Sequence, residues 1–187
     1  MMKKLFFSTL LMTLLFIEAM FAQVPGVSSP VKFDLGIGGG VSLPTDKLSD
    51  SHNTGFHVGA KARLHSFMPL SIVGSGNYNR LPEKNADNTD SQWMLGVGLE
   101  YPIPSVVVKP YLGVDALVNV FKNEGTGTSS FTRGGVGLGV GIEFSIPAFG
   151  SFDTSVKYQL FNVVGKENGE ETISQIAASV ALMFSVL

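Results

Sequence analysis

The chain has 187 residues, of which only 15% are charged, and its formal net charge at pH 7 is −2. It contains no cysteine, which excludes disulfides, zinc–thiolate sites, thiol catalysis and a lipoprotein anchor. The near-neutral charge leaves no basic surface for nucleic acid. A chain of this length indicates one domain. A soluble exterior normally carries about 25–35% charged residues, so the surface of this domain is poorly suited to water.

Residues 1–22 have the pattern of a secretory signal peptide. Lys3 and Lys4 precede an apolar run, and the small Ala22 ends the segment. The run is shorter than the roughly 20 residues of a membrane helix. We predict cleavage after Ala22 and one mature domain over residues 23–187. An uncleaved N-terminal anchor is the alternative.

The first half of the mature chain alternates between apolar and polar side chains in four segments. These segments are residues 31–43, 54–67, 70–80 and 93–101, and Val73 is an apolar residue on the polar face of its segment. A period of two is typical of β-strands whose two faces meet different surroundings. Each segment therefore predicts one strand.

The second half continues the pattern over residues 106–121, 135–146, 152–164 and 176–186. Residues 135–146 read G-V-G-L-G-V-G-I-E-F-S-I, in which large apolar side chains alternate strictly with small or polar ones. The run is as long as the roughly 9–11 residues that a tilted strand needs to cross a bilayer. We therefore predict eight strands.

The breaks between the segments alternate in kind. Long polar breaks cover residues 44–53, 81–90, 122–130 and 165–171, whereas short breaks marked by Pro or Gly lie near residues 68, 103 and 148. In an up-and-down meander, alternate breaks lie at opposite ends. The layout therefore predicts an all-β fold, an eight-stranded antiparallel up-and-down transmembrane β-barrel, with the long loops extracellular and both termini and the tight turns periplasmic.

Two interpretations of the apolar face remain. It meets lipid, or it lines the cup of a soluble lipocalin-like ligand binder. The sparse charge, the many glycines on the opposite face and the banding of aromatic residues favour lipid, because aromatic girdles mark the two membrane interfaces. The predicted girdle residues are Phe33, Phe56, Tyr78, Trp93, Tyr101, Phe144, Phe152 and Phe184.

The layout and two short segments resemble a known family. Residues 109–113 (K-P-Y-L-G), residues 155–159 (S-V-K-Y-Q) and the apolar last strand are similar to the OmpA/OmpX-type small outer-membrane barrels, over the whole mature chain. The chain ends in Leu187 where that family often has an aromatic residue, and Phe184 is the nearest one. No domain follows the barrel, so the peptidoglycan binding of two-domain relatives is not implied.

The face opposite the apolar one carries ionisable residues that we predict to pair with one another in the lumen. Charges in a narrow barrel stay ionised only if they are paired or hydrated. We expect a salt-bridge network that plugs the interior; a narrow ion or solute channel is the alternative. The predicted lumen residues are Lys32, Asp34, His57, Lys61, Arg63, His65, Glu100, Lys109, Asp115, Glu143, Asp153 and Lys157.

Catalysis is not expected, because His57 and His65 face the lumen and a lipid-modifying enzyme needs a base and a nucleophile near the lipid. That enzyme remains a further alternative. We expect no cofactor and no metal. The expected partners are outer-membrane lipid, lipopolysaccharide and the barrel-assembly machinery, and the four long loops are the candidate contacts for a surface partner. The expected state is a monomer in the bacterial outer membrane.

Overall fold

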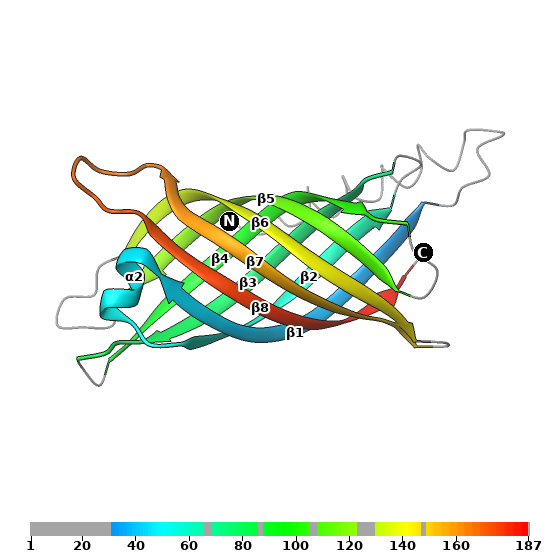
Figure 1. Ribbon diagram of the computed structural model, residues 1–187, viewed down its shortest axis with the longest axis horizontal. Helices are drawn as coiled ribbons and strands as arrows, with labels where there is room; N and C mark the ends of the chain where they lie inside the picture. The colour runs from blue at the N-terminus through cyan, green and yellow to red at the C-terminus, as the bar shows by residue number, and fades with distance from the viewer. Residues whose placement is uncertain are drawn as a thin grey trace, which may run out of the picture. The chain divides into compact units, whose positions relative to one another are not determined.

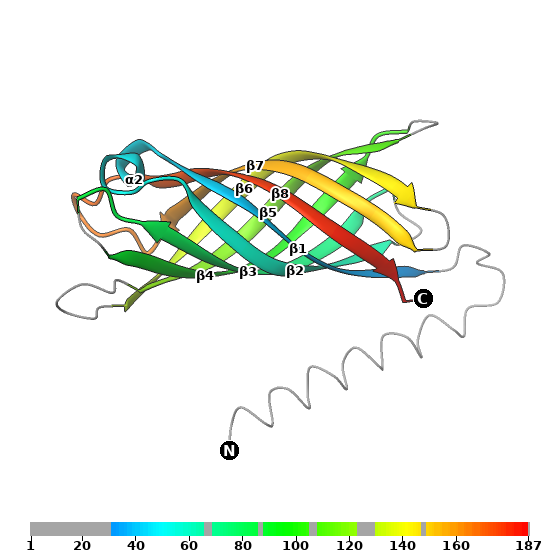
Figure 2. The same cartoon turned by 90° about the horizontal axis from the view of Figure 1, so that it is seen from below.

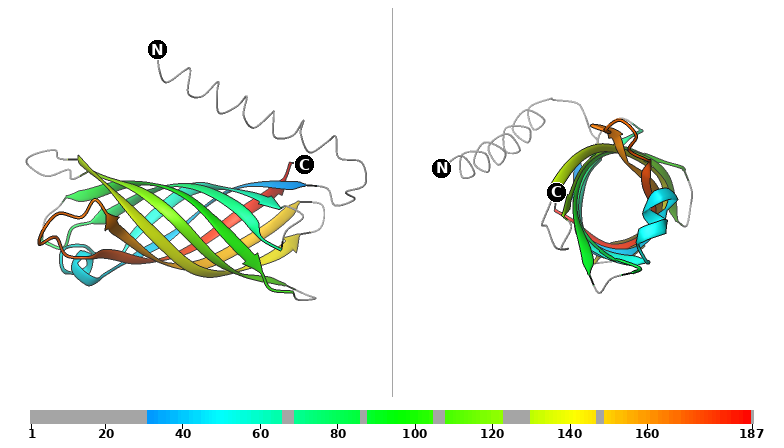
Figure 3. Two further views of the ribbon diagram at one scale, coloured as in Figure 1. Left: turned by 90° about the horizontal axis from the view of Figure 1, so that it is seen from above. Right: turned by 90° about the vertical axis from the view of Figure 1, so that its left-hand side faces the viewer.

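The computed structural model describes residues 31–65, 69–85, 88–104, 108–122, 130–146 and 149–186. Eight antiparallel strands close into one barrel, in which β1 pairs with both β2 and β8 (Figures 1 and 3). The predicted fold class is confirmed. The predicted signal peptide, the turn near residue 68 and most of the loop over 122–130 lie outside the described residues.

Most of the strands are longer than the sequence pattern predicts, whereas β2 and β5 are shorter than the predicted segments. β6 has 17 residues and begins at Ser130, before the alternating run itself. Backbone N–H and C=O groups pair with the next strand whatever the side chains are, so pairing continues beyond the alternating residues. The strands are β1 (Lys32–Thr45), β2 (Gly55–His65), β3 (Ser71–Pro82), β4 (Thr89–Pro102), β5 (Lys109–Lys122), β6 (Ser130–Ile146), β7 (Gly150–Val164) and β8 (Ile173–Ser185).

The two ends of the barrel differ. The connections after β1, β3, β5 and β7 lie at one end, which we call the loop end. The C-terminus of β8 lies at the opposite end, which we call the turn end (Figures 1 and 2). No helix among the described residues is long and apolar enough to span a membrane.

Side chains point alternately into and out of the barrel. Along β4, Trp93 and Leu95 are 58% and 61% exposed, whereas Met94 and Glu100 are buried. Val73, the apolar residue on a polar face, is 1% exposed and lies inside, beside Arg63 in the register. The strand period decides its orientation, because the next residue along a strand must face the other way.

Residues 44–53 were predicted to be a loop, which is wrong for most of this range. β1 continues to Thr45, and Asp46–Ser51 form the short helix α2 at the loop end (Figure 2). Leu48 is the buried residue of this helix and packs inside the barrel mouth. A single apolar side chain in a polar stretch has no periodicity, so the sequence offered no helical signal.

Candidate functional site

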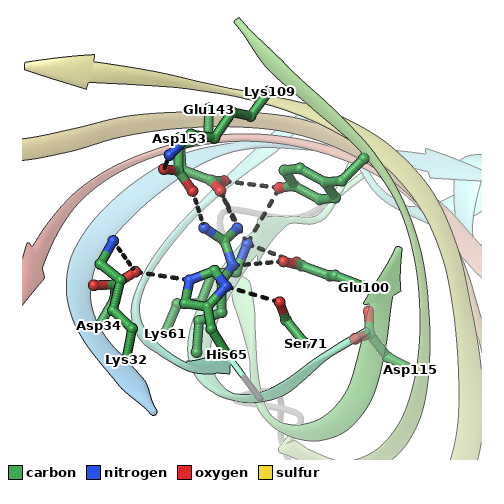
Figure 4. A network of polar contacts seen from close by, with 12 residues as sticks. Lys32, Asp34, Lys61, His65, Ser71, Glu100, Lys109, Asp115, Glu143 and Asp153 are labelled. Carbon is green, nitrogen blue, oxygen red and sulfur yellow. Dashed lines mark hydrogen bonds and ion pairs between the residues drawn. The ribbon is translucent and has the colours of Figure 1, made fainter. Parts of the chain in front are cut away.

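The centre of the lumen network is Arg63, whose side chain is 2% exposed. Its Nε donates to Glu100 on β4 at 2.7 Å, and its Nη2 donates to Asp153 on β7 at 2.5 Å. Its Nη1 donates to Glu143 on β6. Charge-assisted bonds of this kind are the strong ones, and together they tie β2 to three other strands (Figure 4).

Two lysines and a tyrosine complete this centre. Lys61 Nζ lies 2.8 Å from Glu100 Oε1 and donates to Asp153 and to the Tyr111 hydroxyl, both at 3.2 Å. The Tyr111 hydroxyl donates to Asp153 Oδ1 at 2.9 Å. Lys109 donates to Glu143 at 3.2 Å. The three cations therefore balance the three carboxylates, and we call these seven residues the ionic centre.

The other predicted lumen residues form smaller groups beside the ionic centre. Lys157 and Asp115 pair at 2.5 Å. At the turn end, Asp34 pairs with Lys32 at 3.0 Å and with His65 Nε2 at 2.9 Å. The Lys32 side chain is 42% exposed and that of Lys109 is 56% exposed, so both lie at the rim of the barrel rather than deep in it.

A second layer of uncharged polar side chains crosses the lumen on the loop-end side of the ionic centre. His57 is the one predicted lumen residue in this layer, with Ser42 at 3.1 Å from Nδ1 and Ser179 at 2.9 Å from Nε2. The chain of hydrogen bonds continues at 2.9–3.2 Å and ends on a backbone oxygen. This amide layer consists of Ser179, His57, Ser42, Asn79, Gln92, Asn119 and the carbonyl of Phe161.

The sequence analysis did not single out the amide layer, because neutral residues give a weaker signal than charges do. The usable signal was the alternation itself, which put Asn79 and Asn119 on the polar face. An amide inside a narrow barrel must find a partner there, since leaving a buried polar group unpaired costs roughly 1–3 kcal/mol. Asn79, Gln92 and Asn119 are each 0% exposed and all hydrogen bonded.

The lumen at the loop end is apolar, a departure from the uniformly polar interior that the sequence predicts. Phe121 stacks on Phe131 with ring centroids 4.9 Å apart and meets the edge of Phe161 at 5.7 Å. We call this group the apolar cluster. It consists of Leu48, Leu81, Met94, Leu117, Phe121 and Phe161, with Phe131 and Ile173 packed against it.

Two small spaces lie among these layers. A polar cavity of about 70 Å³ is lined by residues such as Lys61, Asn79 and Asp115. A second space, of about 190 Å³, lies beside the apolar cluster and α2, and Phe131 and His52 line it. A water needs roughly 10–15 Å³ on this measure, so the polar cavity has room for about five waters.

Serine, histidine and aspartate lie together twice. At the loop end, Ser51 Oγ is 2.8 Å from His52 Nδ1, and His52 Nε2 is 3.1 Å from Asp90. In the lumen, Ser71, His65 and Asp34 repeat the arrangement at 3.0 and 2.9 Å. Among the described residues, no group of three or more His, Asp or Glu is placed to hold a metal ion.

The predicted girdle residues lie on the outer face of the barrel. Tyr78 and Trp93, from neighbouring strands, have ring centroids 4.9 Å apart near the loop end. Phe149 is 72% exposed and was not in the predicted set, because it lies in a turn rather than in the alternating pattern. Among the other predicted girdle residues, Phe33 is half-buried. Those with side chains more than one third exposed are Phe56, Tyr101, Phe144, Phe152 and Phe184.

Comparison with known proteins decides the family. The family model of the outer membrane protein beta-barrel domain matches residues 8–184, nearly the whole chain. The chain belongs to the outer membrane protein beta-barrel domain family. The apolar outer wall of this family member is therefore the face that meets lipid, and its location is the bacterial outer membrane.

Several solved structures of outer-membrane barrels share the fold. Neisserial surface protein A is 21% identical with a TM-score of 0.63, over 81% of this chain and 97% of its own. The N-terminal barrel of Pseudomonas aeruginosa OprF is 11% identical with a TM-score of 0.51, over 82% and 97%.

Ail of Yersinia pestis, in complex with the heparin analogue sucrose octasulfate, is 15% identical with a TM-score of 0.50, over 83% of this chain and 100% of its own. No curated protein sequence matches the chain.

Proposed function

We propose that this outer-membrane barrel is a non-catalytic, plugged scaffold that presents its four long loops at the cell surface, with both termini periplasmic. The observation that carries the proposal is the ionic centre. Arg63, from β2, binds carboxylates of β4, β6 and β7 across the lumen. A side chain held from three directions occupies the space through which a solute would pass.

The energetics favour a closed lumen. Withdrawing a buried cation from its partners leaves uncompensated charge, which costs roughly 3–5 kcal/mol. An eight-stranded barrel is just wide enough for its own side chains. The amide layer and the apolar cluster follow the ionic centre toward the loop end, so opening one layer leaves two others in place.

Ion pairs connect several elements of the loop end, which supports a role in surface interaction. Lys47 of α2 pairs with Glu171 at 3.0 Å, and Arg133 pairs with Glu167 and Glu170 at 3.0 and 3.1 Å. These ion pairs join the β7–β8 connection to α2 and to β6 and favour one arrangement of its polar side chains. A rigid scaffold that displays loops is a common way to place binding residues.

The serine–histidine–aspartate arrangement does not support catalysis. In the tautomer with its proton on Nε2, His52 donates to Asp90 and accepts from Ser51. The same order of contacts recurs with the 4% exposed Ser71, packed in the lumen. We infer that the hydroxyl and carboxylate partners at both places satisfy the hydrogen bonds of a partly buried imidazole.

Single-channel recording tests the plug. Purified protein in planar bilayers should show no large, stable conductance steps, while a wide-barrel porin added to the same bilayer as a control should show them. Porin-sized steps from this protein would refute the proposal. A narrow channel is the second candidate, favoured by the polar cavity of about 70 Å³, and small, reproducible steps would support it.

A further inference from the structure

The charged side chains of the described strands point into the barrel with two exceptions. Arg80 follows the outward-facing Tyr78 by two positions, and Lys122 follows the outward-facing Val120 by two. Residues two apart on a strand share a face. Both exceptions are basic, and both lie at the loop end, so the outer wall carries positive charge at one end only.

The two basic residues lie in one row of the sheet. Arg80 pairs with Ser91 of β4, and Ser91 pairs with Lys122 of β5. Neighbouring strands are about 4.8 Å apart, so the two backbone positions are roughly 10 Å apart. Ser91 lies between them and is only 5% exposed although it faces outward. We call these three residues the basic row.

The basic row lies at the level of lipid headgroups. Tyr78 and Trp93, whose rings are 4.9 Å apart, are two positions nearer the barrel middle on the same strands. Aromatic side chains of this kind lie at the membrane–water interface. The next residues toward the loop end therefore reach the phosphate region, and long basic side chains extend easily to it.

The chemistry of the row suits a phosphate group. A guanidinium offers a planar set of donors that matches phosphate, and an ammonium adds a compact charge. Arg80 also has an interaction within the chain. Its five N–H donors allow further bonds beyond that one.

We propose that Arg80 and Lys122, on either side of the buried Ser91, bind the phosphate of a lipid in the leaflet that surrounds the loop end. The proposal deepens the proposed function and rests on its orientation, in which the loop end lies at the cell surface. A bilayer lipid is favoured over a free anion because the row adjoins the apolar wall, where an acyl chain can pack against Tyr78 and Trp93.

The single tryptophan of the chain reports on this site directly. Trp93 is 58% exposed on the outer wall, so brominated lipids beside it quench its fluorescence. The protein is reconstituted in phosphatidylcholine vesicles containing 20 mol% dibrominated phosphatidic acid, and in matched vesicles in which the bromine is on phosphatidylcholine. The ratio of quenching gives the preference for the phosphate-bearing lipid at this position.

Each basic residue near a membrane surface favours anionic lipid by roughly 1 kcal/mol, so we expect a preference of about fivefold or more. The double variant Arg80→Gln/Lys122→Gln should reduce the preference to near unity. The matched control Lys84→Gln/Lys166→Gln, which removes two positive charges from exposed loop positions, should keep it. Heat-modifiable gel migration verifies that both variants fold.

Three results would overturn the proposal. The first is equal quenching by both lipids in the natural protein, and the second is an equal loss of preference in the control variant. The third is loss of the preference on adding 10 mM inorganic phosphate, which would indicate an adventitious ion only. Conductance is measured separately, so a failed lipid site and a failed plug give different results.

Discussion

At the scale of single residues, Arg63 differs from every other cation of the lumen. Its guanidinium is 2% exposed and donates to three carboxylates, whereas Lys109 is 56% exposed and donates to one. A buried charge depends on its partners far more than an exposed one does, because water cannot replace them. The two side chains therefore form a matched pair for testing the ionic centre.

Replacing Arg63 by Met should lower the free energy of unfolding by about 3–5 kcal/mol, since three carboxylates lose their shared cation. Lys109→Met should cost less than about 1 kcal/mol, as exposed ion pairs do. Urea unfolding in lipid vesicles, followed by Trp93 fluorescence, measures both values. Equal stability of the two variants would show that the buried Arg63 contributes no more to the ionic centre than the exposed Lys109 does.

At the scale of elements, the connection between β7 and β8 is held down by Glu170. The backbone N–H of Glu167, the Arg133 guanidinium and the Asn162 amide all donate to its carboxylate. These donors lower the pKa of Glu170 to about 2, with the backbone N–H the largest cause. Glu170 therefore stays ionised, and keeps these hydrogen bonds, near pH 4, where ordinary carboxylates begin to lose their charge.

The stabilisation from Glu170 depends on pH in a defined direction. Because its folded pKa is below the value of about 4.3 in unfolded chains, the contribution is complete above that pH and is lost as the pH falls toward 2. The protection factors for hydrogen exchange of residues 165–172, which remove the intrinsic pH dependence of exchange, should therefore stay constant to about pH 3 in the natural protein. Glu170→Gln should raise exchange at pH 6, whereas Glu167→Gln, which keeps the backbone donor, should change it little. No difference between the two variants would contradict this.

At the scale of the whole molecule, the lumen is closed by layers in series. The ionic centre lies toward the turn end, the amide layer follows, and the apolar cluster closes the loop end. Resistances in series add, so current is limited by whichever layer remains closed. One of the exposed connections, α2, contributes Leu48 to the last layer.

Loss of one layer should therefore leave the barrel closed. Arg63→Ala alone and Phe161→Ala alone should each show no large conductance in planar bilayers, while the double variant should show more frequent current steps than either. Gel migration of each refolded variant is the control for folding. A conducting Arg63→Ala single variant would place the whole barrier in the ionic centre.

The sequence predicts much of this fold because the side chains along each strand alternate with a period of two. Where a strand is buried on one side and meets lipid on the other, each residue is assigned to a face by its position alone. That is why Glu143 and Asp153 were assigned to the lumen, and why even Val73 lies where its position requires. Gln92 and Phe161 also face the lumen according to their positions in the strands. Their side chains are uncharged, however, so the sequence did not indicate that they take part in the layers of the lumen.

What the sequence determined by itself is therefore the number of strands, the two faces of the wall and the end at which the long connections lie. The tertiary structure alone decided which side chains meet across the lumen. Arg63 lies 37, 80 and 90 positions from its three carboxylates, and only closure with a particular stagger between strands brings them to one height. The same closure gathered scattered apolar residues such as Leu48 and Phe161 into one seal, because contacts across a barrel depend on its register and not on local sequence.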